Sequence, residues 1–164
     1  MANHEMVLLL KQYKYEFVKT SLGTMRVFVS RGRKPDNIVL VHGLIVSSSF
    51  MRPTAKELAK KHKVFVPDLL GHGKSEVPEK FLTIDDHASS LKEALDRMHV
   101  TNPIVVGGSY GCQVAVELAH RVDVRGLVFV GPNPGGDALS GICELAMDGL
   151  REPPALVLRV LREF

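Results

Sequence analysis

The sequence has no tryptophan, only two cysteines and no long apolar run. Two cysteines cannot build the disulfide framework of a small secreted domain, so Cys112 and Cys143 are expected to be small buried residues. No stretch approaches the roughly 18 apolar residues that span a bilayer. The short apolar run at residues 6–10 ends at Lys11, with no small-residue cleavage site after it. These absences predict a cytoplasmic chain without a membrane partner.

The charge balance is also unremarkable, with 21 Lys and Arg against 18 Asp and Glu and a net charge of +3. The densest basic run, residues 52–63, alternates with helix-forming apolar residues, which predicts a solvated helix face and no nucleic-acid partner. No pair of cysteines or histidines has metal-ligand spacing, so neither a metal nor a cofactor is expected. A hydrophobic content of 45% excludes a disordered chain, and 164 residues fit one domain.

Buried strands are predicted where short apolar runs show no alternation with polar residues. Such runs occupy residues 37–41, 64–66, 103–106 and 126–130. Strands that are apolar on both faces are typical of a parallel sheet covered by helices on both sides. Two earlier segments, 13–20 and 25–30, are predicted to form an antiparallel hairpin, with Gly23 suited to the turn between them.

Helical segments lie between these strands, at residues 53–62, 84–98 and 110–121. Thr83 and Asp86 resemble a capping box at the start of the second helix. The alternation predicts an α/β fold, with a mostly parallel sheet, helices on both faces and the antiparallel N-terminal hairpin. The core is assigned to residues 1–136. In the remainder, 137–164, the segments 139–150 and 154–164 are predicted to be helical, with no further strand.

The sequence Gly107-Gly108-Ser109-Tyr110-Gly111 follows a buried strand and opens a helix, which is G-x-S-x-G in its strand–turn–helix setting. The sharp turn strains the serine backbone, and only small residues fit two positions before and after it. Ser109 would stand at the carboxyl edge of the sheet, where the helix N-terminus favours negative charge. The alternatives are a turn without chemistry and a phosphate-binding loop. The patterns G-x-G-x-x-G and G-x-x-x-x-G-K, which are typical of phosphate-binding loops, are both absent here.

Two other loops follow buried strands at the same edge of the predicted sheet. His42-Gly43-Leu44 can turn a backbone N–H toward the serine. Residues 68–75 have the pattern D-x-x-G-x-G-x-S, whose glycines permit a sharp loop. These three motifs, in this order over residues 10–135, resemble the α/β-hydrolase fold family in its serine hydrolase branch.

The resemblance implies that Ser109 is the nucleophile and that the N–H groups of Leu44 and Tyr110 form the oxyanion hole. It also implies that seven residues support the turn at residues 107–111, here called the elbow, and the two loops before it: His42, Gly43, Gly107, Gly111, Asp68, His72 and Ser75. Residues 137–164 resemble the start of the helical cap that family members place over the active site. Apolar residues in this segment, among them Ile142, Leu145, Leu150 and Leu156, suggest a small apolar acyl substrate, and packing of a core or lid would explain them equally well.

In this family the catalytic acid usually follows the seventh strand and the histidine follows the eighth. The predicted strands reach only the sixth, so the resemblance covers the N-terminal portion of such an enzyme, not fully active alone. Asp137 could be the acid or a helix-capping residue. Four histidines on or beside helices are expected to be solvated or to cap helices: His62, His87, His99 and His120. The exposed edge of the last strand could bind a C-terminal half or a second copy.

The sequence therefore predicts a serine hydrolase acting on an ester or related acyl bond. A serine at the elbow disfavours the family branches that use an aspartate nucleophile. The alternative is a non-catalytic binding or partner-interaction module on the same scaffold, and dinucleotide binding is a third hypothesis.

Overall fold

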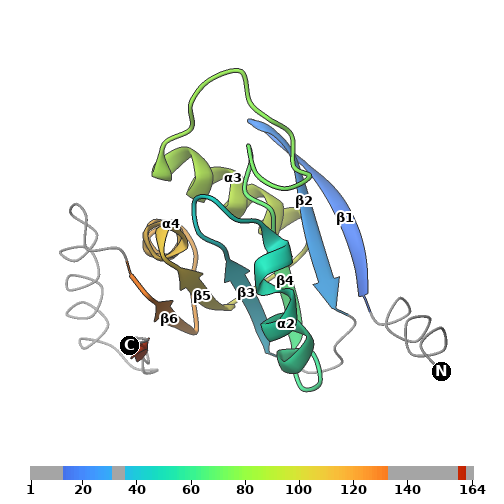
Figure 1. Ribbon diagram of the computed structural model, residues 1–164, viewed down its shortest axis with the longest axis vertical. Coiled ribbons are helices and arrows are strands. Elements are labelled where there is room, and N and C mark those ends of the chain that lie inside the picture. The colour runs from blue at the N-terminus through green and yellow to red at the C-terminus, as the bar shows by residue number, and fades with distance from the viewer. Residues whose placement is uncertain (1–12, 31–35, 133–158, 162–164) are drawn as a thin grey trace.

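A seven-stranded mixed sheet forms the centre of the computed structural model, which describes residues 13–30, 36–132 and 159–161 (Figure 1). The strands are β1 (Tyr13–Thr20), β2 (Gly23–Ser30), β3 (Asn37–Val41), β4 (Lys63–Pro67), β5 (Ile104–Gly108), β6 (Gly126–Val130) and β7 (Arg159–Leu161). Their order in the sheet is β1-β2-β4-β3-β5-β6-β7. The predicted α/β fold with a mostly parallel sheet is confirmed.

The N-terminal hairpin forms as predicted, with β1 and β2 antiparallel from the pair Tyr13–Ser30 to the pair Thr20–Gly23. Strand β2 begins at Gly23, two residues earlier than expected. Gly23 has φ +143°, a backbone conformation that favours glycine, so it is the last residue of the tight turn and the first of the strand. The hairpin joins the rest of the sheet through antiparallel pairing of β2 with β4.

Strands β3, β4, β5 and β6 are parallel, and β3 lies between β4 and β5. In a parallel sheet, all carboxyl ends meet at one edge, where ligands usually bind. This topology brings together the loop after β3, the loop after β4 and the turn after β5. The three sequence motifs therefore share one edge of the sheet.

Helices cover both faces of the sheet, with α2 (Ser48–Leu58) on one side and α3 (Ile84–Arg97) and α4 (Tyr110–Ala119) on the other (Figure 1). Helix α3 begins with the predicted capping box, in which the side chains and backbones of Thr83 and Asp86 bond reciprocally. Helix α2 begins five residues before the predicted start. The Ser47 side chain caps it, and Pro53 lies inside the helix.

Strand β7 corrects the prediction that residues 154–164 are helical and that no strand follows β6. It pairs in parallel with β6, from Val128–Arg159 to Val130–Leu161. The edge of β6 presents unpaired backbone groups, and their pairing outweighs the local helix preference of a short apolar segment. The predicted open edge is therefore covered along these residues. Residues 137–158 of the predicted cap, with Asp137 and Cys143, lie outside the described residues.

Within the described ranges, no helix is long and apolar enough to cross a bilayer. The same residues contain no group of three side chains that could together hold a metal ion.

Candidate active site

Ser109 occupies a sharp turn between β5 and α4. Its backbone has φ +50° and ψ −117°, outside the conformations that residues other than glycine commonly adopt. Such strain costs on the order of 1–3 kcal/mol and persists only where the surrounding structure enforces it. The Ser109 N–H donates to the Val130 carbonyl at 3.0 Å, so β6 helps to hold the turn. Ser109 is exposed to solvent, which the predicted role of a nucleophile requires.

The two glycines of the motif are required by close backbone packing. A β-carbon on Gly107 would lie 2.5 Å from the carbonyl oxygen of Gly111. A β-carbon on Gly111 would overlap the carbonyl oxygen of Val41 at the end of β3. The second contact brings the start of α4 against the loop after β3. Only glycine allows the serine and this loop to approach so closely.

The loop after β3 lies directly against the serine, because a β-carbon on Gly43 would be 3.5 Å from the Ser109 β-carbon. Among the described residues, the backbone N–H groups of Leu44 and Tyr110 donate to no other group. Tyr110 is the first residue of α4, where helix N–H groups have no intrahelical acceptor. Within the described ranges, both predicted oxyanion donors are therefore unpaired, and both belong to segments that adjoin the Ser109 turn.

His42 orients the Leu44 N–H through the peptide bond between Gly43 and Leu44. The fully buried ring accepts a hydrogen bond at Nε2 from the Leu69 N–H, at 3.0 Å. Its proton therefore resides on Nδ1, which donates to the Gly43 carbonyl at 2.7 Å. Because a peptide bond is planar, a hydrogen bond to that carbonyl also restrains the direction of the Leu44 N–H.

The electrostatics of His42 agree with a supporting role. Burial lowers the pKa of His42 and outweighs the opposing effect of its hydrogen bond to Gly43, so the ring is neutral near pH 7. A ring whose two nitrogens are both occupied by backbone partners has no free lone pair to take a proton from Ser109.

Asp68 organises the loop after β4. Its buried carboxylate accepts hydrogen bonds from the N–H groups of Ser48 and Lys74, at 2.7 and 2.9 Å, and from Arg26 Nε at 2.8 Å. Burial raises the pKa of Asp68. The hydrogen bonds from Ser48, Lys74 and Arg26 together lower this pKa by a larger amount, so it lies below its ordinary value. Asp68 thus connects α2, β2 and its own loop, as expected for a loop-shaping residue.

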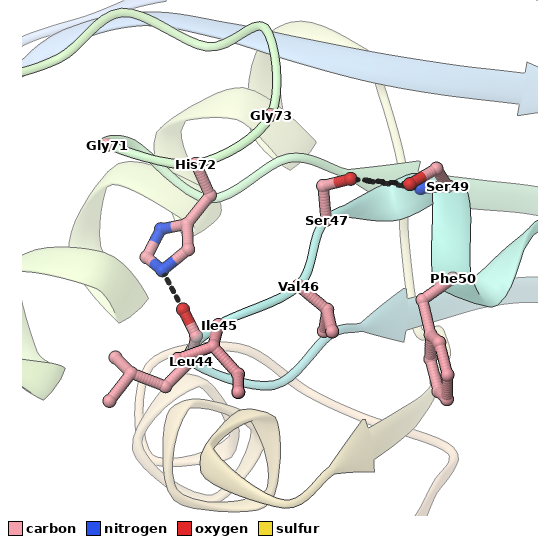
Figure 2. A pocket seen from close by; sticks show the side chains of 9 residues that line it. All are labelled: Leu44, Ile45, Val46, Ser47, Ser49, Phe50, Gly71, His72 and Gly73. Carbon is pink, nitrogen blue, oxygen red and sulfur yellow. Dashed lines mark hydrogen bonds between the residues drawn. The ribbon is translucent and has the colours of Figure 1, made fainter.

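An open pocket of about 710 Å³ lies between the two loops (Figure 2). Its rim carries exposed apolar side chains, with exposed fractions of 54% for Leu44, 95% for Ile45 and 70% for Phe50. The loop after β4 supplies Gly71, His72 and Gly73 to the opposite side. Ser109 is not among the described residues that line this pocket; the pocket adjoins the serine turn through the loop after β3, which lies against Ser109.

The prediction for His87 is wrong, because this residue is neither solvated nor a cap. It is 4% exposed on the inner side of α3, where its ring meets the Tyr110 ring edge-on at 5.9 Å. Burial and the neighbouring His72 lower the pKa of His87 to about 4. The helical spacing from Ile84 to His87 to Leu91 places it on the apolar face, which the sequence could have indicated. In contrast, His99 and His120 are exposed as predicted.

Within the part of the chain that the structure describes, no histidine or carboxylate hydrogen-bonds to the Ser109 hydroxyl. The described residues therefore bring together the serine and two backbone N–H groups next to a pocket with an apolar rim, and none of them is a base hydrogen-bonded to the serine. A serine hydroxyl without a base is a weak nucleophile.

The chain matches the family model described as alpha/beta hydrolase fold over residues 36–152. The Arabidopsis thaliana protein named "Probable lysophospholipase BODYGUARD 3" is 33% identical over 92 residues, which are 52% of this chain and 18% of that protein. A haloalkane dehalogenase of Mesorhizobium japonicum is 29% identical over 105 residues, 63% of this chain and 34% of the dehalogenase.

Among solved structures, an N-acyl homoserine lactonase complexed with N-butanoyl homoserine superposes with a TM-score of 0.70 and 28% identity. The match covers 74% of this chain and 46% of the lactonase. The chain spans about a third or less of the length of the curated relatives it matches. The relatives are named for different activities, among them a probable lysophospholipase, a lactonase and a haloalkane dehalogenase.

Proposed function

Because this chain belongs to the alpha/beta hydrolase fold family, we propose that it is the nucleophile-bearing part of a serine hydrolase that cleaves an ester or related acyl bond. One observation carries the proposal. Ser109 is an exposed serine held at φ +50° between two glycines that pack against backbone atoms. Strain of this kind is characteristic of functional positions, because folding alone would favour a relaxed residue there.

In the proposed reaction, Ser109 Oγ attacks the carbonyl carbon of the acyl substrate and its proton passes to a general base. The carbonyl π electrons move to oxygen, and the N–H groups of Leu44 and Tyr110 stabilise the resulting oxyanion. Collapse of this intermediate expels the alcohol, which takes the proton, and leaves an acyl-serine. Water then hydrolyses the acyl-serine. The base and its orienting acid would come from residues outside those described.

The exposed apolar rim of Leu44, Ile45 and Phe50 supports a small apolar acyl substrate. The names of two similar proteins, a probable lysophospholipase and an N-acyl homoserine lactonase, agree with this proposal. We propose that neither nucleic acid nor a membrane is a partner of this chain. A C-terminal half, or a second copy of this chain, would complete the site.

A non-catalytic binding module on the same fold is the second candidate. The observation that favours it is the lack of a base hydrogen-bonded to Ser109 within the described ranges. Haloalkane hydrolysis is disfavoured, because the residue at the elbow is serine rather than the aspartate that the resemblance implies for that branch.

A fluorophosphonate probe distinguishes these candidates. Ser109 Oγ would form a bond to phosphorus, fluoride would leave, and the hydroxyl proton would pass to the base. We expect labelling in the full-length protein that contains this chain, and loss of labelling in Ser109→Ala. Ser49→Ala is the matched control, because Ser49 is an exposed serine that lines the neighbouring pocket. Labelling that persists in Ser109→Ala, or no labelling of the full-length protein, would contradict the proposal.

A further inference from the structure

His72 connects the loop after β4 to the loop after β3 at the rim of the pocket (Figure 2). Its Nε2 lies 2.5 Å from the Leu44 carbonyl oxygen, and its Nδ1 lies 3.1 Å from the Leu70 carbonyl oxygen. A carbonyl oxygen only accepts hydrogen bonds and a neutral imidazole carries a single N–H, so only one of the two ring nitrogens is the donor. The shorter contact places the proton on Nε2, which donates to Leu44.

This hydrogen bond acts on the second of the two peptide planes that meet at the Leu44 α-carbon. His42 Nδ1 holds the carbonyl of the first plane, at Gly43, and His72 Nε2 holds the carbonyl of the second, at Leu44. The backbone of Leu44 can rotate only by turning one plane against the other. With both carbonyls held, the N–H of Leu44 has a fixed direction relative to the Ser109 turn.

Side-chain packing contributes little to holding residues 44–45 of this loop. The side chains of Leu44 and Ile45 are 54% and 95% exposed, so little apolar burial holds residues 44–45 in place. Segments with few buried contacts open locally at low free-energy cost. The hydrogen bond from His72 supplies a restraint that side-chain burial does not.

The surroundings of His72 hold its ring and its backbone in place. Its ring lies between those of His42 and His87, with centroid distances of 5.2 and 6.0 Å. The neighbouring residues Gly71 and Gly73 have φ +80° and +58°, so the chain turns sharply on both sides of it. A β-carbon on Gly73 would overlap the buried Asp68 carboxylate, which shows how closely the loop is anchored.

We propose that His72 is a positioning residue that, through the Leu44 carbonyl, directs the Leu44 N–H toward the oxyanion formed at Ser109. This inference rests on the proposed function, because it names a residue that serves the same site. His72 contacts no reacting atom in this role. It acts on the transition state by keeping one of two hydrogen-bond donors aligned before the reaction begins.

Two substitutions of similar size separate this role from a general structural one. In His72→Gln, the amide nitrogen takes the position of Nε2 and can still donate to Leu44. In His72→Asn, the amide nitrogen takes the position of Nδ1 and can reach only Leu70. We expect the fluorophosphonate rate constant of Ser109 to fall roughly tenfold or more in His72→Asn, since loss of a whole donor costs about 100- to 1000-fold. His72→Gln should stay within about threefold of the wild type, and half-saturating probe concentrations should not change.

Hydrogen exchange of the backbone over residues 43–47, measured on the same full-length proteins, provides a readout that does not need activity. Protection should fall in His72→Asn and be retained in His72→Gln. Equal labelling and equal protection in both variants would overturn the inference, as would an equal loss in both. If the wild type itself is not labelled, the proposed function fails. The exchange data then report separately whether His72 orders the loop.

Discussion

Arg26 and Asp68 form a largely buried ion pair that joins strand β2 to the loop after β4. Arg26 Nε and Nη2 lie 2.8 and 2.6 Å from the same carboxylate oxygen, Oδ2, and the Asp68 side chain is fully buried. The other oxygen, Oδ1, accepts the Ser48 N–H at the start of α2. One carboxylate therefore connects the hairpin, helix α2 and the loop after β4.

Replacing Arg26 with alanine should destabilise the fold strongly. The substitution leaves a buried carboxylate without its cationic partner, which typically costs about 3–5 kcal/mol. Urea denaturation at pH 7 would measure the change in the free energy of unfolding. Lys14→Ala is the matched control, because the Lys14–Glu16 ion pair is exposed and should contribute less than about 1 kcal/mol. Similar effects of the two substitutions would contradict this account of Asp68.

His87 should make the fold sensitive to mild acid. Its pKa is about 4 in the folded state against an ordinary value of 6.5, so the unfolded state binds the proton more readily. Stability from this residue is therefore present above pH 6.5 and is lost as the pH falls toward 4, by about 3 kcal/mol in total. His87→Leu should remove this loss. Urea denaturation between pH 7 and pH 4 would test it, with His120→Gln, an exposed histidine, as the control.

Gly107→Ala should disrupt the elbow, whereas Gly126→Ala should be tolerated. The added methyl group at Gly107 meets the backbone of Gly111 and Cys112, which cannot move without displacing α4. At Gly126, in the neighbouring strand β6, nothing lies within 4 Å of the added carbon. We expect Gly107→Ala to lose several kcal/mol, on the order of 3, and Gly126→Ala to change stability by about 0.5 kcal/mol or less. Thermal unfolding of the two variants would show whether the clash has this cost.

Ser109→Gly should be more stable than Ser109→Ala, by about 1–2 kcal/mol, because glycine adopts a positive φ without strain. Both variants remove the hydroxyl, so the difference between their free energies of unfolding reports the backbone strain at this position. The midpoints of urea denaturation for the two variants would provide the comparison. An equal midpoint would mean that the turn at Ser109 is not strained in solution.

Local sequence patterns determined much of this protein. The apolar runs at β3, β4, β5 and β6, the capping box at α3 and the glycines around Ser109 each act within a few residues, so their outcome could be predicted. The elbow is a local structure for the same reason. Its glycines specify a turn that only small residues can make.

Tertiary structure decided the contacts between distant residues. His72 and Leu44 are 28 residues apart, Asp68 and Arg26 are 42 apart, and neither pairing leaves a periodic pattern in the sequence. The short strand β7 forms because the edge of β6 offers backbone partners, which no local preference reveals. Residue types and local geometry could thus identify the serine turn, whereas the hydrogen bonds that orient the groups around it depend on how the sheet brings its loops to one edge.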